Sequence, residues 1–298
     1  MGAQSVSGKK VVITGANSGI GYEAAKALAA KGAQVILAVR NEEKGNQAIA
    51  ELKAINTDIS VQMMFLDLAD LKTIQHFAEM YTAQFDSLDI LINNAGVMMP
   101  PYSKTKDGFE LQFGSNHLGH FALTGLLLPL LKKTKGSRVV TVSSLAHRGA
   151  SIDFENLDGS KGYKAFKFYG QSKLANLLFA KELDNRLKSN GIETLSIACH
   201  PGVSSTNLFK MGGKFLQPIV KIANRFFQPA SMGALPTIYA ATEAGLVGGE
   251  YIGPDGKGNR SGYPAIEQPA NGVYNENTMK KLWDISEQMT GVHYPFSS

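Results

Sequence analysis

Short apolar runs alternate along the chain with stretches in which apolar positions recur every three or four residues. The short runs are rich in Val, Ile and Leu, which is typical of buried strands, whereas the periodic stretches predict amphipathic helices. Strands are predicted at residues 10–14, 34–39, 61–66, 88–92, 138–142, 192–198 and 250–252. Helices are predicted at residues 19–30, 42–54, 71–84, 109–132, 169–188 and 276–289.

The alternation of strands and helices predicts the architecture. Continuous runs such as Val11-Val12-Ile13 indicate strands that are buried on both faces. We therefore expect an α/β fold, a doubly wound (Rossmann-type) parallel sheet of about seven strands with helices on both faces. No repeat or linker divides the chain, so we expect one domain over residues 1–298, with a cofactor half at about 8–145 and a catalytic helix and substrate region at about 146–298. In such folds ligands bind at the carboxyl ends of the strands.

Composition narrows the classes of partner. The chain has 298 residues, of which 44% are hydrophobic and 18% charged, so a large core is possible and a disordered protein is excluded. The formal charge is +5, but the basic residues are scattered, and we expect no nucleic-acid partner. This mild positive balance suits an anionic cofactor.

Other features bear on the compartment. Cys199 is the only cysteine, which excludes an intramolecular disulfide and fits a reducing, cytoplasmic location. Residues 1–10 lack the apolar segment of a signal peptide. The longest apolar stretch, residues 118–131, is too short to span a bilayer. We therefore expect no membrane anchor.

A glycine-rich turn follows the first predicted strand. Gly15, Gly19 and Gly21 remove side chains where a pyrophosphate would approach the backbone, and the next helix offers free N–H groups at its start. Taken alone, the pattern also fits an ordinary tight turn between a strand and a helix.

Residues at the ends of later strands suggest the type of dinucleotide. Arg40 follows the second strand, where a protein that prefers NAD places a carboxylate, and an arginine there can pair with a 2′-phosphate. This favours NADP(H) over NAD(H), although a surface arginine is the alternative. Asp67 follows the third strand and could accept a hydrogen bond from adenine, and the small residues of Asn94-Ala95-Gly96 would let the backbone pass close to the cofactor.

Tyr169 and Lys173 lie four positions apart in a predicted helix and therefore share one of its faces. A tyrosine titrates near pH ~10 in water, and a neighbouring ammonium favours the phenolate and lowers that pKa. The pair is a candidate proton donor for a carbonyl oxygen. Ser143 and Ser144 follow the strand at residues 138–142 and point in opposite directions, so one of them can hydrogen-bond the substrate carbonyl.

Polar residues interrupt the apolar helix predicted at residues 109–132. Asn116 needs a hydrogen-bond partner if it is buried, and it either holds a water behind Lys173 or bends the helix. His117 and His120 lie three positions apart, a spacing that can hold a metal, but no third ligand is evident. We therefore expect no metal site.

Taken in order along the chain, these motifs resemble the short-chain dehydrogenase/reductase family. They are Thr14-Gly15-Ala16-Asn17-Ser18-Gly19-Ile20-Gly21, Asn93-Asn94-Ala95-Gly96, Asn116, Ser144, Tyr169 with Lys173, and Pro201-Gly202. The resemblance implies an oxidoreductase that interconverts a small-molecule carbonyl and its alcohol by hydride transfer. It also implies a catalytic tetrad of Asn116, Ser144, Tyr169 and Lys173, and so selects Ser144 over Ser143.

In the implied tetrad Tyr169 is the acid/base, Ser144 polarises the carbonyl, Lys173 binds ribose and tunes Tyr169, and Asn116 keeps a water-linked proton route. The resemblance further implies that Pro201, Gly202 and Val203 line the nicotinamide, with Thr206 near its carboxamide. The expected cofactor-binding residues are Gly15, Asn17, Ser18, Gly19, Ile20, Gly21, Arg40, Asp67, Leu68, Asn94, Ala95, Gly96, Tyr169, Lys173, Pro201, Gly202, Val203 and Thr206.

Finer features are similar to the branch that includes retinol dehydrogenases and protochlorophyllide reductase. These are residues 116–121, residues 143–147 and the segment Lys281-Leu282-Trp283-Asp284-Ile285-Ser286-Glu287. The branch implies NADP(H) and a lipophilic ketone or aldehyde. The apolar stretch 209–227 would then be either a lid over the substrate or a helix packed on the core.

The chain departs from the compact family pattern between Ser144 and Tyr169, which lie 25 positions apart. We expect the additional residues, including 148–167, to lie near the mouth of the active site and to alter a face that many members use to dimerise. A monomer and a homodimer are therefore both compatible with the sequence.

Two other functions fit parts of the pattern. A sugar-nucleotide epimerase or dehydratase also uses a tyrosine and a lysine four positions apart, but it usually has a different glycine spacing and a larger C-terminal region. A non-catalytic dinucleotide sensor or scaffold on the same fold typically loses the tyrosine or the lysine, and both Tyr169 and Lys173 are present here.

Overall fold

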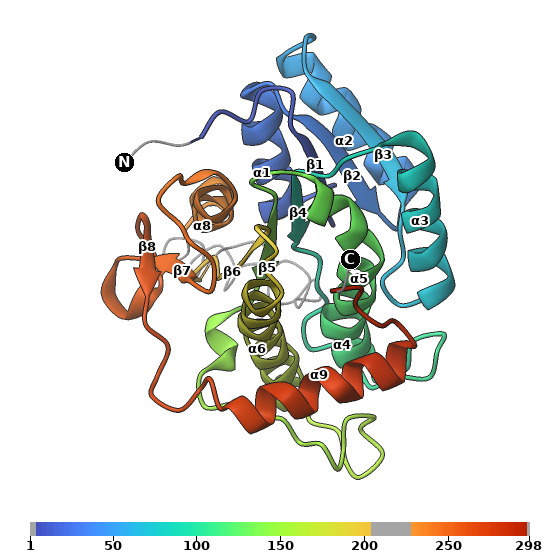
Figure 1. The fold of residues 1–298 in the computed structure, drawn as a ribbon, viewed down its shortest axis with the longest axis vertical. Coiled ribbons are helices and arrows are strands. Elements are labelled where there is room, and N and C mark those ends of the chain that lie inside the picture. The colour runs from blue at the N-terminus through green and yellow to red at the C-terminus, as the bar shows by residue number, and fades with distance from the viewer. Residues whose placement is uncertain (1–3, 204–227, 297–298) are drawn as a thin grey trace, which may run out of the picture.

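Eight strands form one sheet in the computed structural model, which describes residues 4–203 and 228–296. Their order is β3-β2-β1-β4-β5-β6-β7-β8, and all neighbours are parallel except the antiparallel pair β7 and β8 (Figure 1). The strands are β1 Lys10–Thr14, β2 Gln34–Val39, β3 Ser60–Phe65, β4 Ile90–Asn93, β5 Arg138–Val142, β6 Leu195–Cys199, β7 Tyr251–Pro254 and β8 Pro264–Glu267.

Helices cover both faces of the sheet, as the sequence predicted. On one face α1, α2 and α8 pack around Val11 and Ile13, and on the other α3, α5 and α6 pack around Val12. Burying each of these side chains stabilises the fold by about 1.5–3 kcal/mol. The helices are α1 Gly19–Ala30, α2 Glu42–Ile55, α3 Leu71–Gln84, α4 Leu111–Phe113, α5 Gly119–Lys133, α6 Ala165–Ser189, α8 Ala230–Thr242 and α9 Glu276–Thr290.

The sheet has one strand more than the sequence predicted. β8 was missed because it has only four residues, begins with a proline and lies in a segment rich in glycine and proline. Among the described strands it lies at the edge of the sheet and pairs with β7 alone, a position in which a proline does not interrupt a hydrogen-bonded ladder.

Helix boundaries also differ from the prediction. The stretch predicted as one helix at 109–132 consists of α4, a π-helical turn at Gly114–Leu118, and α5. A π-turn inserts one extra residue per turn, which a periodicity of 3.6 does not reveal. Helix α6 begins four residues before Tyr169, and α8 was not predicted because its apolar positions lack a clear polar face.

Residues 148–167, inserted after Ser144, are not among those that line the cavity at the carboxyl ends of the strands, and their expected position near its mouth stays a prediction. Ile152, Phe154 and Leu157 pack against α6 and α9. In Figure 1 this segment forms the light-green loop below α9. Apolar contact with the two helices explains the placement, because exposing these side chains would lose their burial.

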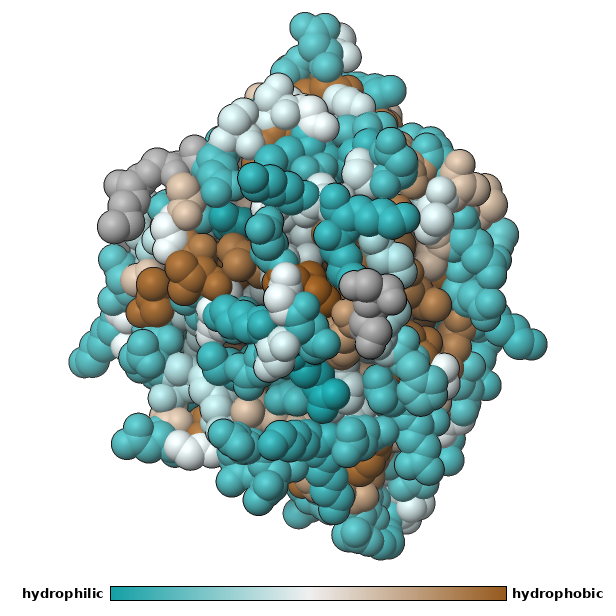
Figure 2. All heavy atoms as spheres, in the orientation of Figure 1, coloured by the Kyte–Doolittle hydropathy of each residue, from teal (hydrophilic) through white to brown (hydrophobic). Residues whose placement is uncertain are grey.

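The surface shown in Figure 2 is mainly hydrophilic, with hydrophobic atoms in separate patches. Large exposed apolar side chains such as Ile55, Phe166 and Tyr263 are distant from one another in the sequence. Within residues 4–203 and 228–296, no helix combines the length and the hydrophobicity needed to cross a membrane.

Two histidines are buried in the helical layer beside the sheet. Nε2 of His117 lies 2.8 Å from the Ser286 hydroxyl of α9, and His120 faces the end of β1. Burial lowers the pKa of His117 to about 3 and that of His120 to about 4. Among the described residues, no three His, Cys, Asp or Glu side chains gather as metal ligands.

We predict that acid destabilises the fold through these histidines. An unfolded histidine binds a proton near pH 6.5, whereas buried His120 resists protonation down to about pH 4. The free energy of unfolding is therefore fully expressed above pH 6.5 and falls as the pH drops toward 4, by up to about 3 kcal/mol for His120 alone. Urea unfolding at a series of pH values measures this slope.

The variant His120→Gln should flatten the slope, even though it is less stable at neutral pH. Replacement of the exposed His76 by glutamine is the matched control and should leave the slope unchanged. An identical slope in the wild type and His120→Gln would contradict the assignment.

Candidate active site

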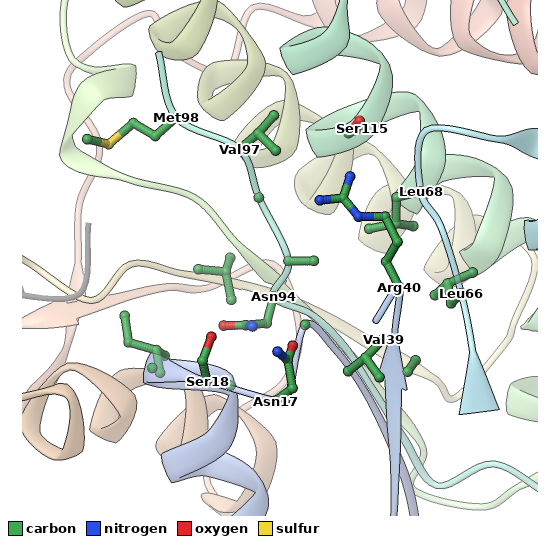
Figure 3. A pocket seen from close by; sticks show the side chains of 18 of the residues that line it. Asn17, Ser18, Val39, Arg40, Leu66, Leu68, Asn94, Val97, Met98 and Ser115 are labelled. Atoms are coloured by element: carbon green, nitrogen blue, oxygen red, sulfur yellow. The ribbon is translucent and has the colours of Figure 1, made fainter. Parts of the chain in front are cut away.

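A cavity of about 850 Å³ opens at the carboxyl ends of β1, β2, β4 and β5. It lies where the strand order reverses between β1 and β4, the position at which open parallel sheets bind ligands. Its volume is within the range of small-molecule and cofactor sites. In Figure 3, Asn17 and Ser18 lie on the turn before α1, and Arg40 extends from the end of β2.

Most of the predicted site residues line this cavity. They are Gly15, Asn17, Ser18, Gly19, Ile20, Gly21, Arg40, Asp67, Leu68, Asn94, Ala95, Gly96, Ser144, Tyr169, Lys173, Pro201 and Gly202. Asn116 and Val203 lie outside the lining. Thr206 and the stretch 209–227 fall outside the described residues.

The glycine turn holds α1 close to the end of β1. Gly15 and Gly19 have φ values of 68° and 61°, a conformation that favours glycine. A Cβ on Gly21 would lie 2.5 Å from Asn94 Nδ2 and 2.8 Å from the Gly15 carbonyl oxygen, so no larger residue fits. The side chain of Ser18 caps none of the first N–H groups of α1, which leaves them available to an anion.

One buried hydroxyl joins three segments around the turn. Thr14 Oγ1 accepts hydrogen bonds of 2.9 Å from the N–H groups of both Asn94 and Ala95 and lies 2.8 Å from His120 Nε2. Because two lone pairs are used, the hydroxyl donates to Nε2 of the histidine. His120 is therefore neutral with its proton on Nδ1, which donates to the Asn116 carbonyl at 2.8 Å.

Asn116 lies in the π-turn, and its side chain clamps the loop after β4. Its Oδ1 accepts from the Val97 N–H at 2.8 Å, and its Nδ2 donates to the Val97 carbonyl and to Ser172 Oγ, each at 2.9 Å. Both amide hydrogens are thus used by the protein. A Cβ on Gly96 would contact both Asn116 Oδ1 and Lys173 Nζ, which places the two side chains together.

Ser144, Tyr169 and Lys173 all line the cavity, near the end of β5 and on α6. The Ser144 hydroxyl lies near Tyr169 and lowers the pKa of the phenol. Lys173 Nζ donates to the Val142 carbonyl at 3.2 Å and lies 5.8 Å from the centroid of the Tyr169 ring. Ser143 instead donates to the Lys173 main-chain carbonyl at 2.7 Å. The two serines therefore differ as strand alternation predicts, and Ser144 is the one beside the tyrosine.

The electrostatics of the pair differ from the expectation that the lysine would lower the pKa of Tyr169. Burial raises the pKa of Tyr169 above 10, against a smaller lowering by the Ser144 hydrogen bond. Burial also lowers the pKa of Lys173 to about 8. The reason is that both groups lie in the interior, where each charged form is poorly solvated. Tyr169 is consequently a neutral phenol, the form that can donate a proton.

The end of the cavity next to β2 and α2 carries two exposed cations. Arg40 follows β2, and Lys44 lies in the first turn of α2, four positions later. Lys44 is not among the site residues predicted from the sequence, although its spacing of four from Arg40 is a usable signal. Asp67 Oδ1 accepts from the Ala69 N–H at 3.0 Å and so orders the loop after β3.

Comparison with known proteins agrees with this geometry. The pattern of the short chain dehydrogenase family matches residues 9–214. Retinol dehydrogenase 11 of Homo sapiens is 43% identical over 285 residues, which cover 96% of this chain and 86% of that protein. Retinol dehydrogenase 13 of Homo sapiens is 39% identical over 98% of this chain and 87% of that protein.

Solved structures share the fold. A crystal structure of an uncharacterised protein from Mycobacterium Paratuberculosis has a TM-score of 0.82 and 41% identity, and covers 98% of this chain and 97% of that one. A short chain dehydrogenase from Shigella flexneri complexed with NADP has a TM-score of 0.64 and 22% identity, over 83% and 98% of the two chains. With this sheet order, this cavity and these relatives, the chain belongs to the short-chain dehydrogenase/reductase family of oxidoreductases, in its retinol dehydrogenase-like branch.

Proposed function

We propose that this oxidoreductase uses NADP(H) to interconvert a lipophilic ketone or aldehyde and its alcohol, with Tyr169 as the acid/base. The observation that carries the proposal is the convergence of Ser144, Tyr169 and Lys173 at one end of the cavity that the glycine turn opens. Acid/base chemistry at a carbonyl needs a proton donor, and hydride transfer needs a bound dinucleotide.

The residues around the turn fit a dinucleotide. A side chain at Gly15 or Gly21 would fill the space next to Asn94 and Ala95, and the uncapped start of α1 supplies N–H donors for a pyrophosphate. Arg40 and Lys44 would hold a 2′-phosphate, because the end of β2 carries these cations where a binder of NAD carries a carboxylate. These features support NADP(H) over NAD(H).

When bound, the nicotinamide supplies or accepts the hydride. Ser144 and the neutral phenol of Tyr169 would both hydrogen-bond the substrate oxygen, and Tyr169 would give its proton to that oxygen during reduction. Lys173, held by the Val142 carbonyl, would stabilise the resulting phenolate. Asn116 keeps the loop at Val97 in place between these groups.

The choice of a lipophilic substrate rests on two observations. Val97 and Met98 line the cavity with apolar side chains. Relatives that are about two-fifths identical over most of the chain are named for a dehydrogenase activity on retinol, a lipophilic alcohol. The first assay is therefore NADPH oxidation with a panel of lipophilic aldehydes and ketones, with NADH in parallel.

Replacing Tyr169 with phenylalanine removes the proposed proton donor and little else. We expect kcat for carbonyl reduction to fall by about 10²–10⁴-fold, because general acid catalysis contributes about that much. NADPH binding, followed by fluorescence titration, should be retained. Tyr163→Phe, which alters a tyrosine outside the cavity lining, is the matched control. Activity that survived in Tyr169→Phe would contradict the mechanism.

The variant Arg40→Asp should shift the cofactor preference. Loss of a charged hydrogen bond to phosphate costs about 1.5–3 kcal/mol, so the ratio of kcat/KM for NADPH to that for NADH should drop about tenfold or more. Lys53→Asp makes the same change of charge on α2, at a position that does not line the cavity, and should leave the ratio unchanged. An unchanged ratio in Arg40→Asp would exclude a 2′-phosphate contact.

The rate of reduction should depend on the proton of Lys173. Its pKa is lowered to about 8, so the ammonium is present below that pH and is lost as the pH rises through it. Because the ammonium favours release of the Tyr169 proton, kcat/KM for reduction should decline above about pH 8, and this parameter reports the free enzyme. A flat profile between pH 7 and 9 would argue against this role.

A further inference from the structure

A buried hydrogen-bonded group lies beside the loop that follows β6. His200 is fully buried, and its Nε2 lies 2.7 Å from Glu267 Oε2 on β8. The other carboxylate oxygen of Glu267 accepts a 2.8 Å hydrogen bond from Arg148, whose side chain is 42% exposed. We call His200, Glu267 and Arg148 the loop brace.

Hydrogen bonding fixes the protonation state of the loop brace. His200 Nδ1 accepts from the Gly202 N–H at 3.1 Å, so the ring proton lies on Nε2 and is donated to the carboxylate. The histidine is therefore neutral, and Arg148 supplies the balancing charge. Burial raises the pKa of Glu267, but the hydrogen bonds from His200 and Arg148 outweigh it, and the net pKa is lowered.

The loop brace joins two loops at the catalytic edge. On one side, Pro201 and Gly202 line the cavity, and Gly202 has a φ of 68°. On the other side, Arg148 ends the short turn Leu145–His147, whose N-terminal cap is Ser144. One carboxylate thus connects the turn that carries the proposed carbonyl-binding serine to the turn that lines the other wall.

The neighbouring backbone leaves room for this connection. A Cβ on Gly253 of β7 would overlap His200 Nε2 and lie 2.6 Å from Glu267 Oε2. Arg148 also donates to the Gly258 carbonyl at 3.1 Å and to Asn259 Oδ1 at 2.7 Å. The hairpin that ends in β8 therefore makes polar contacts with the turn at Leu145–His147 and with the Pro201–Gly202 turn, in addition to the hydrogen bonds that pair its strands.

We propose that His200 and Glu267 are positioning residues for the reaction: they hold the Pro201–Gly202 turn and, through Arg148, the Ser144 turn in the register needed for hydride transfer. The inference rests on the proposed function, since the geometry it protects is that of carbonyl reduction. Misplacing a reacting group by about 1 Å can slow a reaction about a hundredfold.

Two substitutions of His200 test the link. Asparagine keeps an acceptor near Nδ1 but cannot reach Glu267, whereas glutamine places a donor near Nε2. We expect His200→Asn and Glu267→Ala to lower kcat about tenfold to a hundredfold, with KM for NADPH changed less than about threefold, because the glycine turn and Arg40 are untouched. His200→Gln keeps a donor to Glu267 but loses the acceptor for the Gly202 N–H, so it should recover kcat only in part. Glu276→Gln, which alters an exposed pair on α9, is the control for removing a carboxylate.

Equal kcat in the wild type, His200→Asn and Glu267→Ala would overturn the proposal, as would a loss in His200→Gln equal to that in His200→Asn. If the buried variants do not fold, as thermal melting would show, Arg148→Ala decides the matter from the partly exposed end. It should lower kcat severalfold without lowering the melting temperature much, and Arg148→Lys should restore part of the rate. No change in kcat for Arg148→Ala would then reject the proposal.

The proposed function and the loop brace can fail separately. If the wild type binds NADPH but reduces no carbonyl, the function is wrong, and the fluorescence of bound NADPH still reports on the nicotinamide end. That signal should change in His200→Asn and change less in His200→Gln if the loop brace positions the turn. An identical signal in all three proteins would reject the loop brace.

Discussion

The pairing of β1 with β2 on one side and β4 on the other sets where this protein can bind a ligand, because the connections on the two sides run over opposite faces of the sheet. The carboxyl ends of β1 and β4 are left uncovered between them, and the cavity lies there. Thr14, the last residue of β1, fixes the positions of the segments that border this cavity. Its single hydroxyl ties the loop after β4 to the turn before α1 and, through His120, to the π-turn.

Burial of polar groups is the second constraint, and it shifts the pKa values of Tyr169 and Lys173. Lys173 lies in the interior, where its ammonium donates to the Val142 carbonyl. Burial lowers its pKa, because the charged form is poorly solvated there. Tyr169 is buried beside it and keeps its proton for the same reason. In the free protein the Lys173 ammonium does not set the pKa of Tyr169, because the loss of solvation acts on both side chains. A proton donor that stays neutral until the substrate oxygen becomes basic suits reduction of a carbonyl.

The sequence predicted those features of the site that are formed within a single helix, strand or turn. The glycine turn, the one-turn spacing of Tyr169 and Lys173, and the opposite directions of Ser143 and Ser144 all follow from helix and strand periodicity, and the structure has each of them. Features that depend on tertiary contact could not be read in this way. Strand β8 exists because β7 is available to pair with it, and the packing of Ile152, Phe154 and Leu157 of the inserted segment against α6 and α9 is likewise a tertiary contact.

The loop brace also depends on tertiary contacts, and for that reason no sequence motif reveals it. Glu267 lies 67 positions after His200 and 119 after Arg148, and the family pattern ends at residue 214. Many of the motif residues that the sequence analysis named line the cavity itself, so their types are set by what the cavity binds. The residues that hold two catalytic loops at a fixed separation need only a complementary hydrogen bond from whichever element borders them. In this chain that element is the antiparallel edge strand, and the carboxylate at its end gives the C-terminal hairpin a part in the geometry of the active site.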